Sequence, residues 1–509
     1  MLKNLIVKIV SLLLVCVMLG AVVVSCGGDD VDPDNPSNND PSTPGDVPVE
    51  VVDTILEGVD VDMQGYEFNV LCREGPMFMM EATAEDGTGD QVAQAVFNRN
   101  KYVEDRFNCL LTNTPQTESN EGTLTSTWNK SVTTGENIYK LGLGHMMYTA
   151  TECLNGTMLN LTELPYVDLE QPYWHRSMIN AAMVNGKLYF TASDYCTSSV
   201  YYTYVMIFNM LKCQEIDVDV YGMVDDGTWT IGELQKIVST CYADDGDNVV
   251  EFEDDTFGFV THYNTALVNW VFAMDIPVTS NPSEGKMEVY FGNDRSIKGA
   301  EKLYDLLFES SNGSIIQDEV EPGQTFDPNH PDMKITTKFG NGEAYFTATK
   351  IFALENLRSS ETTYGIVPYP KFDEEQQEYF SHVDGRASFL FVPYTLPKSE
   401  YETVGILLEA LTASTTKYVM PVIQDSALLS RYSEDSVAYQ MLQKTLDGRA
   451  YAFAYFYNSS SNTKPYWVYQ SMMNNKNDNL TNAWRSKALT ASRDFSTILS
   501  KLQKLHKNG

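Results

Sequence analysis

Residue types that carry chemistry occur throughout this chain, but their spacing matches few catalytic or metal-binding patterns. No G-x-S-x-G, H-E-x-x-H or Walker A motif is present, and no two of the six histidines lie close together in sequence. Gly142-Leu143-Gly144 lacks the third glycine of a dinucleotide-binding loop. The sequence therefore gives no positive support for an enzyme, and we expect no catalytic residues, no cofactor and no metal.

Acidic residues offer two further possibilities. Residues 244–255 (DDGDNVVEFEDD) are rich in oxygen ligands, but they lack the alternating acids and central glycine of an EF-hand. We interpret them as an acidic surface loop, with calcium binding left open. A glycosidase would need two carboxylates about 5–10 Å apart, and among 69 acidic residues proximity in sequence is uninformative.

Cys26 lies at the end of an N-terminal apolar run. The run extends from Leu5 to Val24, Lys3 and Lys8 lie at or near its start, and the first acid is Asp29. This order is typical of a secretory signal, and Val23-Val24-Ser25-Cys26 resembles the lipobox of bacterial lipoproteins, in which the cysteine is acylated. A plain signal peptide or a single membrane helix is the alternative. In either case the body of the protein lies outside the cytoplasm.

Six cysteines remain after Cys16 leaves with the signal and Cys26 becomes the anchor. An even number outside the cell permits disulfides, but the spacings match no framework and no C-x-x-C occurs. Free buried cysteines are the preferred interpretation. The six are Cys72, Cys109, Cys153, Cys196, Cys213 and Cys241.

Composition limits the class of protein. The hydrophobic content of 43% can fill a core in a chain of this length, whereas residues 27–50 are polar and proline-rich and predict a flexible tether. The formal net charge of −34 would repel a phosphate backbone. Nucleic-acid binding is therefore not expected.

Apolar periodicity predicts alternating strands and helices. Strands are expected near 66–71, 138–143, 188–192, 200–208, 344–346, 364–367 and 389–392, and helices over 90–107, 145–156, 231–242 and 294–310. Thr230 and Glu233 form a capping box before the third helix. From residue 400 onward the pattern is mostly helical. This alternation indicates an α/β fold with mainly parallel sheets.

Several stretches, taken in order, resemble one family. They include AVFNRNKYVEDRFN at 95–108, TWTIGELQKIV at 228–238, FGNGEAYFTATKIFALENL at 339–357 and the VGILLEALTAST helix. Together with the lipobox and tether, they resemble the family 1, sugar-type extracellular solute-binding proteins of bacterial ABC importers. The resemblance covers most of residues 60–460 and implies a periplasmic-binding-protein-like fold of two α/β lobes, with the ligand between them.

The resemblance implies a division of the chain. Residues 1–25 would be the signal peptide and 26–58 the lipidated tether. Lobe 1 would comprise 59–192 with 348–398, and lobe 2 would comprise 193–347 with 399–509. Chain crossings are expected near 190–195, 347–352 and 393–400.

Ligand-binding residues are expected where strands end at the cleft. Carbohydrate sites combine aromatic faces with polar groups that bind hydroxyls. Tyr201, Tyr202 and Trp270 lie in apolar runs and are expected in the core. The predicted ligand-binding residues are Glu74, His145, Tyr148, Asp194, Tyr195, Tyr263, Asn264, Lys350, Asp384, Arg386 and Tyr457.

These features together predict a monomeric, lipid-anchored capture protein at the outer face of the cell membrane. It would bind a carbohydrate or oligosaccharide and deliver it to an ABC permease. Lys350-Ile351-Phe352 stands where well-studied sugar binders carry tryptophan. Because a lysine favours an anionic or heavily hydroxylated ligand, the identity of the sugar is left open. The alternatives are a cell-surface polysaccharide-binding or degrading lipoprotein and a non-transport sensor.

Overall fold

A computed structural model describes residues 55–117, 122–263, 265–317, 333–428 and 436–506. The predicted signal, Cys26 and nearly all of the tether lie outside these residues. Two main sheets and one short pair are formed by β1 (Tyr66–Arg73), β2 (Cys109–Gln116), β3 (Leu141–His145), β4 (Tyr204–Asn209), β5 (Phe257–His262), β6 (Ser314–Gln317), β7 (Ala344–Lys350), β8 (Tyr364–Val367), β9 (Ser381–His382), β10 (Ser388–Phe391) and β11 (Arg449–Ala450).

Helices surround the two sheets. They are α2 (Pro76–Ala82), α3 (Gln91–Phe107), α4 (Thr123–Thr134), α5 (Met146–Cys153), α6 (Arg176–Ala182), α7 (Ser198–Tyr201), α8 (Met210–Glu215), α9 (Val220–Asp225), α10 (Ile231–Val238), α11 (Thr265–Ala273), α12 (Asp294–Phe308), α13 (Met333–Gly340), α14 (Tyr401–Ser414), α15 (Met420–Leu428), α16 (Ser436–Asp447), α17 (Phe453–Phe456), α18 (Tyr466–Asn474), α19 (Leu480–Arg485) and α20 (Ala488–Leu502). Short 3₁₀ turns are η1 (Leu161–Glu163), η2 (Pro282–Glu284), η3 (Ile351–Leu357) and η4 (Lys398–Glu400), and η5 (Thr415–Val419) is a π-helical turn.

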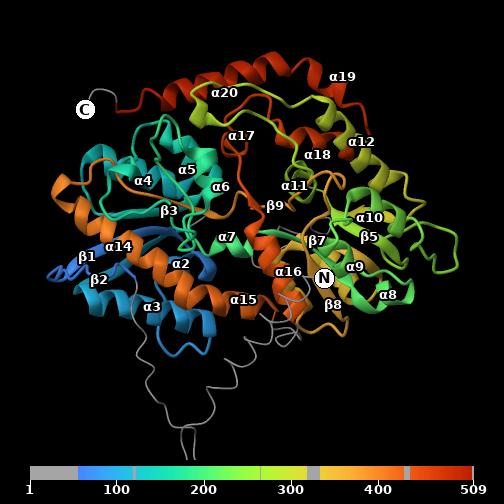
Figure 1. Cartoon of the computed structure of the whole chain (residues 1–509), viewed down its shortest axis with the longest axis horizontal. Helices are drawn as coiled ribbons and strands as arrows, with labels where there is room; N and C mark the ends of the chain where they lie inside the picture. Colours follow the sequence, from blue (N-terminus) through green and yellow to red (C-terminus); the bar gives the residue numbers. More distant parts are fainter. Residues whose placement is uncertain (1–54, 118–121, 264, 318–332, 429–435, 507–509) are drawn as a thin grey trace, which may run out of the picture. The chain divides into compact units, whose positions relative to one another are not determined.

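The first sheet has the order β10-β3-β1-β2. β1 pairs in parallel with β2 and β3, while β10 runs antiparallel to β3. Helices α3, α4 and α5 pack against its strands (Figure 1). Asp90 starts α3 because its side chain accepts hydrogen bonds from the amides of Val92 and Ala93, at 2.8 and 3.0 Å.

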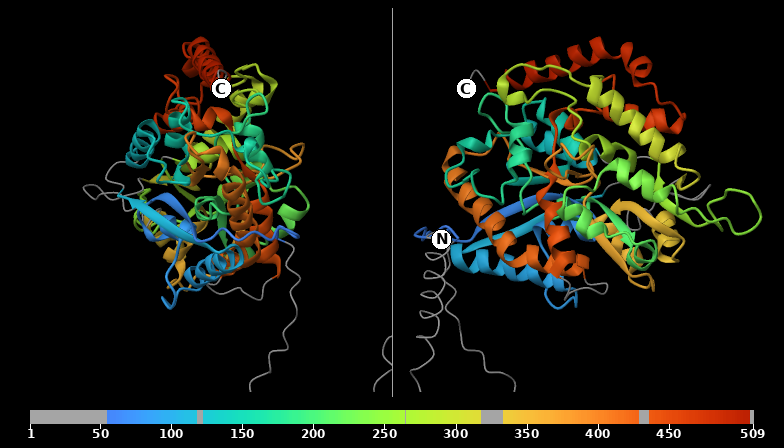
Figure 2. Two further views of the ribbon diagram at one scale, coloured as in Figure 1. Left: turned by 90° about the vertical axis from the view of Figure 1, so that its left-hand side faces the viewer. Right: turned by 45° about the vertical axis from the view of Figure 1, so that its right-hand side comes forward.

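The second sheet has the order β6-β5-β7-β4-β8. β5 pairs in parallel with β6 and β7, and β4 is antiparallel to both β7 and β8. Helices α10, α13 and α16 pack on this sheet. The C-terminal helix α20 lies outside both sheets in both views of Figure 2.

Many predicted elements are confirmed. The strand at 66, the helix from Asp90 and the helix after Thr230 are present, and the Thr230 hydroxyl accepts the Glu233 amide at 3.3 Å. The predicted strand over 200–208 is wrong in its first part: α7 occupies Ser198–Tyr201 and β4 begins at Tyr204. Residues 188–192 do not form one of the strands of the sheets, and Thr191 makes an isolated bridge to Leu390.

Strand pairing departs from the predicted division into lobes. β7 is followed by β8, which pairs with β4 in the second sheet, so the chain does not leave that sheet near 347–352. The return to the first sheet lies between β8 and β10. Helix α14 packs against α3, whereas residues 399–509 were expected with the second lobe. Periodicity identifies strands but does not show which sheet they join.

Two glycines permit close packing around the first sheet. A Cβ on Gly142 in β3 would lie 2.4 Å from the ring of Phe391, which contacts Trp128 edge-on at 4.5 Å between ring centroids. A Cβ on Gly405 in α14 would lie 1.9 Å from the carbonyl oxygen of Pro165. The Gly142-Leu143-Gly144 stretch therefore has a packing role in β3. None of the helices in the described ranges is long and apolar enough to cross a membrane.

Replacing Gly142 with alanine should destabilise the protein by about 1–3 kcal/mol, because the new methyl group would overlap the Phe391 ring. Denaturant unfolding measures this change. Gly232→Ala is the matched control: its Cβ would meet only the Thr230 hydroxyl at 3.9 Å in α10, so it should be neutral or stabilising. Equal stability of the two variants would contradict the packing role of Gly142.

Candidate functional site

The facing strand ends of the two sheets meet two chain segments that connect them. We call residues 192–203 the first crossing segment and 368–387 the second. They are joined directly: Thr203 and Val383 form an antiparallel bridge, and the Asp384 amide donates to the carbonyl of Tyr202 at 2.9 Å. β1 and β3 end toward these segments from the first sheet, and β7 ends there from the second. This is the edge at which open α/β sheets bind ligands.

Charged residues concentrate at this junction. Asp384 is buried, and burial opposes its ionisation. The pKa of Asp384 nevertheless lies below its usual value, because two interactions stabilise the ionised form. One is the positive charge of Lys350, and the other is the Arg386 amide, which donates to Asp384 Oδ1 at 2.9 Å. The Arg73 guanidinium lies close by and donates to the carbonyl of Arg386 at 2.5 Å. The junction is therefore a buried polar centre that connects both sheets.

Two histidines at the junction are neutral. Burial, with the neighbouring charge of Arg73, lowers the pKa of His145 to about 3, and its Nδ1 accepts the Met147 amide at 3.2 Å. Burial also lowers the pKa of His382 to about 3. The His382 ring stacks on Phe272 at 4.4 Å, and neither ring nitrogen has a hydrogen-bond partner among the residues that the structure describes.

A pocket of about 390 Å³ lies beside this junction. Its walls are α2, which follows β1, and η3, which follows β7, with further lining from the start of α3, α7, β8 and α15. Its volume falls within the usual range of small-molecule sites. Because it is built from elements that follow strand ends of both sheets, we take it as the candidate binding site and call it the α2–η3 pocket.

Aromatic and polar groups line the α2–η3 pocket together. Phe352 contacts Tyr201 edge-on at 6.4 Å between ring centroids, and both line the pocket. Asp90, Glu355 and Arg358 supply charged groups, and Arg358 pairs with Glu355 at 3.2 Å. Aromatic faces bind the apolar faces of sugar rings, and carboxylates and guanidinium groups bind hydroxyls.

A second pocket, of about 420 Å³, is built differently. It is lined by α6, residues 275–282 and residues 449–453, with Phe272 from the last turn of α11. These are not the segments that directly follow strand ends of the two main sheets. The α2–η3 pocket is therefore the stronger candidate.

Four of the predicted ligand-binding residues come together at the junction: His145, Lys350, Asp384 and Arg386. Tyr148 adds its ring edge-on to His145 at 5.0 Å and is 39% exposed. They do not line the α2–η3 pocket, although Lys350 directly precedes η3.

The other predicted residues lie elsewhere. Asp194 belongs to a separate buried cluster, 2.9 Å from His175 and 2.8 Å from the Thr416 hydroxyl. Tyr195 is buried beneath Arg99, and Tyr457 is buried against Phe453.

Three predicted residues follow strands directly. Glu74 is exposed after β1, with its amide bonded to the Gln116 carbonyl at 2.9 Å. Tyr263 is partly buried after β5, and Asn264 lies outside the described residues. Neither Glu74 nor Tyr263 lines the α2–η3 pocket.

Sequence reasoning missed the pocket walls. Tyr201 was expected in the core, and the structure places it in the pocket lining; Tyr202 and Trp270 are buried as expected. The sequence signal that points to the pocket is Lys350-Ile351-Phe352, of which Ile351 and Phe352 line it. Helix α2 is not among the helices that the sequence pattern predicts.

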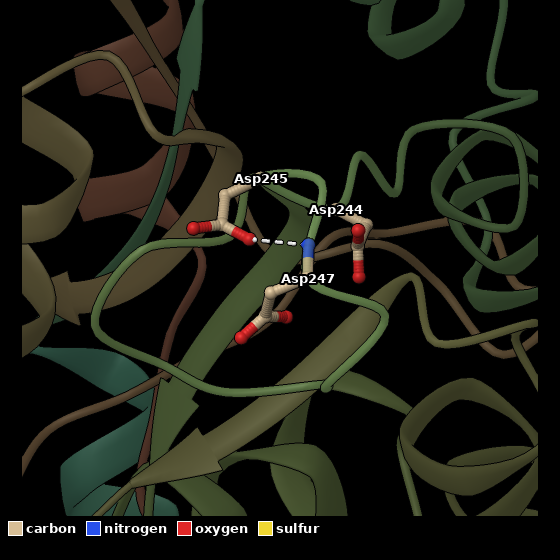
Figure 3. A group of neighbouring side chains, drawn as sticks. All are labelled: Asp244, Asp245 and Asp247. Atoms are coloured by element: carbon tan, nitrogen blue, oxygen red, sulfur yellow. Dashed lines mark hydrogen bonds between the residues drawn. The ribbon is translucent and has the colours of Figure 1, made fainter.

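The acidic loop forms a surface group of three carboxylates (Figure 3). Asp244, Asp245 and Asp247 are exposed, and their carboxylates accept hydrogen bonds from backbone amides of the same turn. For example, the Asp247 amide donates to Asp245 Oδ1 at 3.1 Å. Calcium takes six to eight oxygens, whereas each of these carboxylates already accepts one or two backbone amides of the turn. All six remaining cysteines are buried and free in the described residues.

No family model matches the sequence, and no curated protein matches it. Solved structures do match its fold. UspC of M. tuberculosis superposes with a TM-score of 0.54 at 12% identity, over 85% of this chain and 100% of UspC.

Two further solved structures give the same result. A family 1 extracellular solute-binding protein from Bifidobacterium longum subsp. infantis has a TM-score of 0.52 at 11% identity, over 85% of this chain and 99% of its own. The GacH receptor of Streptomyces glaucescens has a TM-score of 0.51 at 11% identity, over 86% of this chain and 99% of GacH. At these identities the likeness establishes the fold, which is the predicted two-lobed α/β fold of periplasmic binding proteins.

The neutral buried histidines predict that stability falls as the pH is lowered from about 6.5 toward 3. The unfolded chain takes up a proton on each near pH 6.5, whereas the folded chain does so only near 3, so acid favours unfolding. Denaturant unfolding at several pH values measures the slope. His382→Phe keeps a flat ring against Phe272 and should reduce the slope by up to one proton, about 1.4 kcal/mol per pH unit. An unchanged slope in this variant would show that His382 is not held neutral.

Proposed function

We propose that this chain is an extracytoplasmic solute-binding lipoprotein that captures a carbohydrate or oligosaccharide and delivers it to an ABC transporter permease. The observation that carries the proposal is the α2–η3 pocket, which lies between segments that follow strand ends of both sheets in the fold of binding proteins. Closure of such a fold around its ligand is a hinge motion.

The lining of the pocket supports a carbohydrate ligand. Phe352 and Tyr201 offer aromatic surface, while Asp90, Glu355 and Arg358 offer groups that bind hydroxyls. GacH, which shares the fold, has been solved in complex with acarbose. Acarbose is therefore a suitable first probe for this chain.

Export and anchoring are supported by the N-terminal sequence. The apolar run ending in Val23-Val24-Ser25-Cys26 and the polar tether that follows are features of a lipoprotein. An acyl chain on Cys26 would hold the body at the outer face of the membrane, close to a permease in the same membrane. The net charge of −34 disfavours direct adsorption of the body to anionic lipid.

A thermal-shift screen with mono-, di- and oligosaccharides, including acarbose, should find a ligand. A sugar at one hundred times its dissociation constant adds about 2.7 kcal/mol of stability. Phe352→Ala should weaken binding of that sugar about tenfold because it removes a ring from the pocket wall.

Tyr290→Ala is the matched control, since Tyr290 is an exposed aromatic residue that does not line the pocket. Its affinity should equal that of the unmodified chain. Absence of a shift with every sugar would contradict a carbohydrate ligand, and turnover of an oligosaccharide during the screen would favour the degrading alternative.

Replacing Cys26 with alanine should abolish incorporation of labelled palmitate and release the body from the membrane fraction. The reason is that acylation needs the thiol of this residue. Cys16→Ala, which keeps Cys26, should leave labelling unchanged. Labelling retained in the Cys26 variant would show that the lipobox interpretation is wrong.

A further inference from the structure

Glu81, on α2, is the most enclosed carboxylate beside the candidate site. Its side chain is 0% exposed, although it lies on a helix of seven residues that also lines the pocket with Met77 and Met80. An ionised carboxylate is costly to bury unless it is hydrogen-bonded. Its partners therefore indicate what it does.

Both oxygens of Glu81 accept hydrogen bonds from outside α2. Oε1 accepts from the amide of Ser198 at 2.9 Å and from its hydroxyl at 2.6 Å, and Oε2 accepts from the Ser388 hydroxyl at 2.6 Å. Ser198 begins α7, in the first crossing segment, and Ser388 begins β10. The Glu81 side chain thus joins α2 to the first crossing segment and to β10, which directly follows the second crossing segment.

The network closes on itself. The Ser388 amide donates to the Ser198 hydroxyl at 2.9 Å, and Arg73 donates to the Ser388 hydroxyl at 3.0 Å. Arg73 also lies over the ring of Phe78, which belongs to α2, at 3.6 Å. Burial raises the pKa of Glu81, while the hydrogen bonds from the two serines and the charge of Arg73 oppose that rise.

The pocket walls depend on the same elements. Met77 and Met80 extend from α2, and Tyr201 is the last residue of α7, which Ser198 begins. Phe78 stacks on Tyr202 at 6.1 Å, and Tyr202 contacts Phe352 at 6.4 Å. A shift of α2 away from α7 would therefore open one wall of the pocket.

Helix α2 lacks a side-chain cap at its N-terminus, whereas its C-terminal carbonyls are bonded to α3: Arg99 and Asn100 donate to the carbonyls of Glu81 and Ala82 at 3.0 and 2.9 Å. Its N-cap residue, Gly75, has φ 114°, and neither its N-cap nor its first turn supplies a side-chain cap. Gly87 and Gly89 follow it with φ of 72° and 80°. A helix this short is marginal without tertiary contacts.

We propose that Glu81 is a positioning residue: its carboxylate holds α2 against α7 and β10, so that the wall of the α2–η3 pocket moves together with the crossing segments. Ligand contact with Met77 or Met80 is thereby transmitted to the junction between the sheets. The part of this proposal that concerns ligand affinity rests on the proposed function. The part that concerns the position of α2 does not.

Hydrogen exchange of the full chain without ligand tests the position of α2. In Glu81→Gln one acceptor oxygen becomes an NH₂ donor, which then meets a donor of Ser198 or of Ser388, and the negative charge opposite Arg73 is lost. Amides of 77–82 and 198–202 should exchange about tenfold faster or more, with β5 unchanged. Glu85→Gln is the matched control, because Glu85 is exposed in the loop after α2. Exchange equal to the control, or faster exchange spread evenly over the chain, would overturn the proposal.

A second variant, Ser388→Ala, and the affinity for acarbose test the proposal independently of the Glu81→Gln exchange result. Ser388→Ala removes one donor and keeps the carboxylate, so it should loosen 76–82 in the same way even if Glu81→Gln fails to fold. Acarbose affinity should fall about tenfold in Glu81→Gln and stay unchanged in Glu85→Gln. Failure of acarbose and of every other sugar to bind the unmodified chain would count against the proposed function alone, since the exchange result is obtained without ligand.

Discussion

The direct hydrogen bonding between the two crossing segments is the constraint on which the rest of the structure depends. Thr203 pairs with Val383, and the Ile351 amide donates to the Thr203 carbonyl at 3.0 Å. The end of β7, the start of β4 and the return to β10 are thereby fixed in one place. Every strand end at the junction is positioned relative to this short stretch of backbone, and the candidate pocket lies beside it.

Burial of charge is the second property of this junction. Arg73, Glu81, Lys350 and Asp384 are all less than a tenth exposed. Such groups are stable inside a protein only when they are paired and hydrogen-bonded, so each one constrains the segments around it. Apolar packing would hold the lobes together with less directionality. A polar junction instead defines one arrangement of the crossing segments.

The fold class could be predicted from the sequence because alternating strands and helices have strong local signals. Asp90 and Thr230 mark helix starts through caps that depend only on neighbouring residues. Sheet membership of β8 could not be predicted in this way, because pairing with β4 is a long-range choice. Strand-end reasoning selected His145, Lys350, Asp384 and Arg386, and the structure brings these four together at the junction, although none of them lines the α2–η3 pocket. It did not find Glu81, whose partners are 117 and 307 residues away in sequence.

The six buried thiols have a consequence for how this protein is made. Burial raises the pKa of each of them, so the folded chain offers almost no reactive thiolate. For a chain exported as proposed, the oxidising surroundings act only before folding is complete. The thiols then stay reduced only if folding buries them faster than oxidants convert them to disulfides. Slow folding would leave disulfides between thiols that are free in the folded chain, so the redox state of the exported protein would report its folding rate.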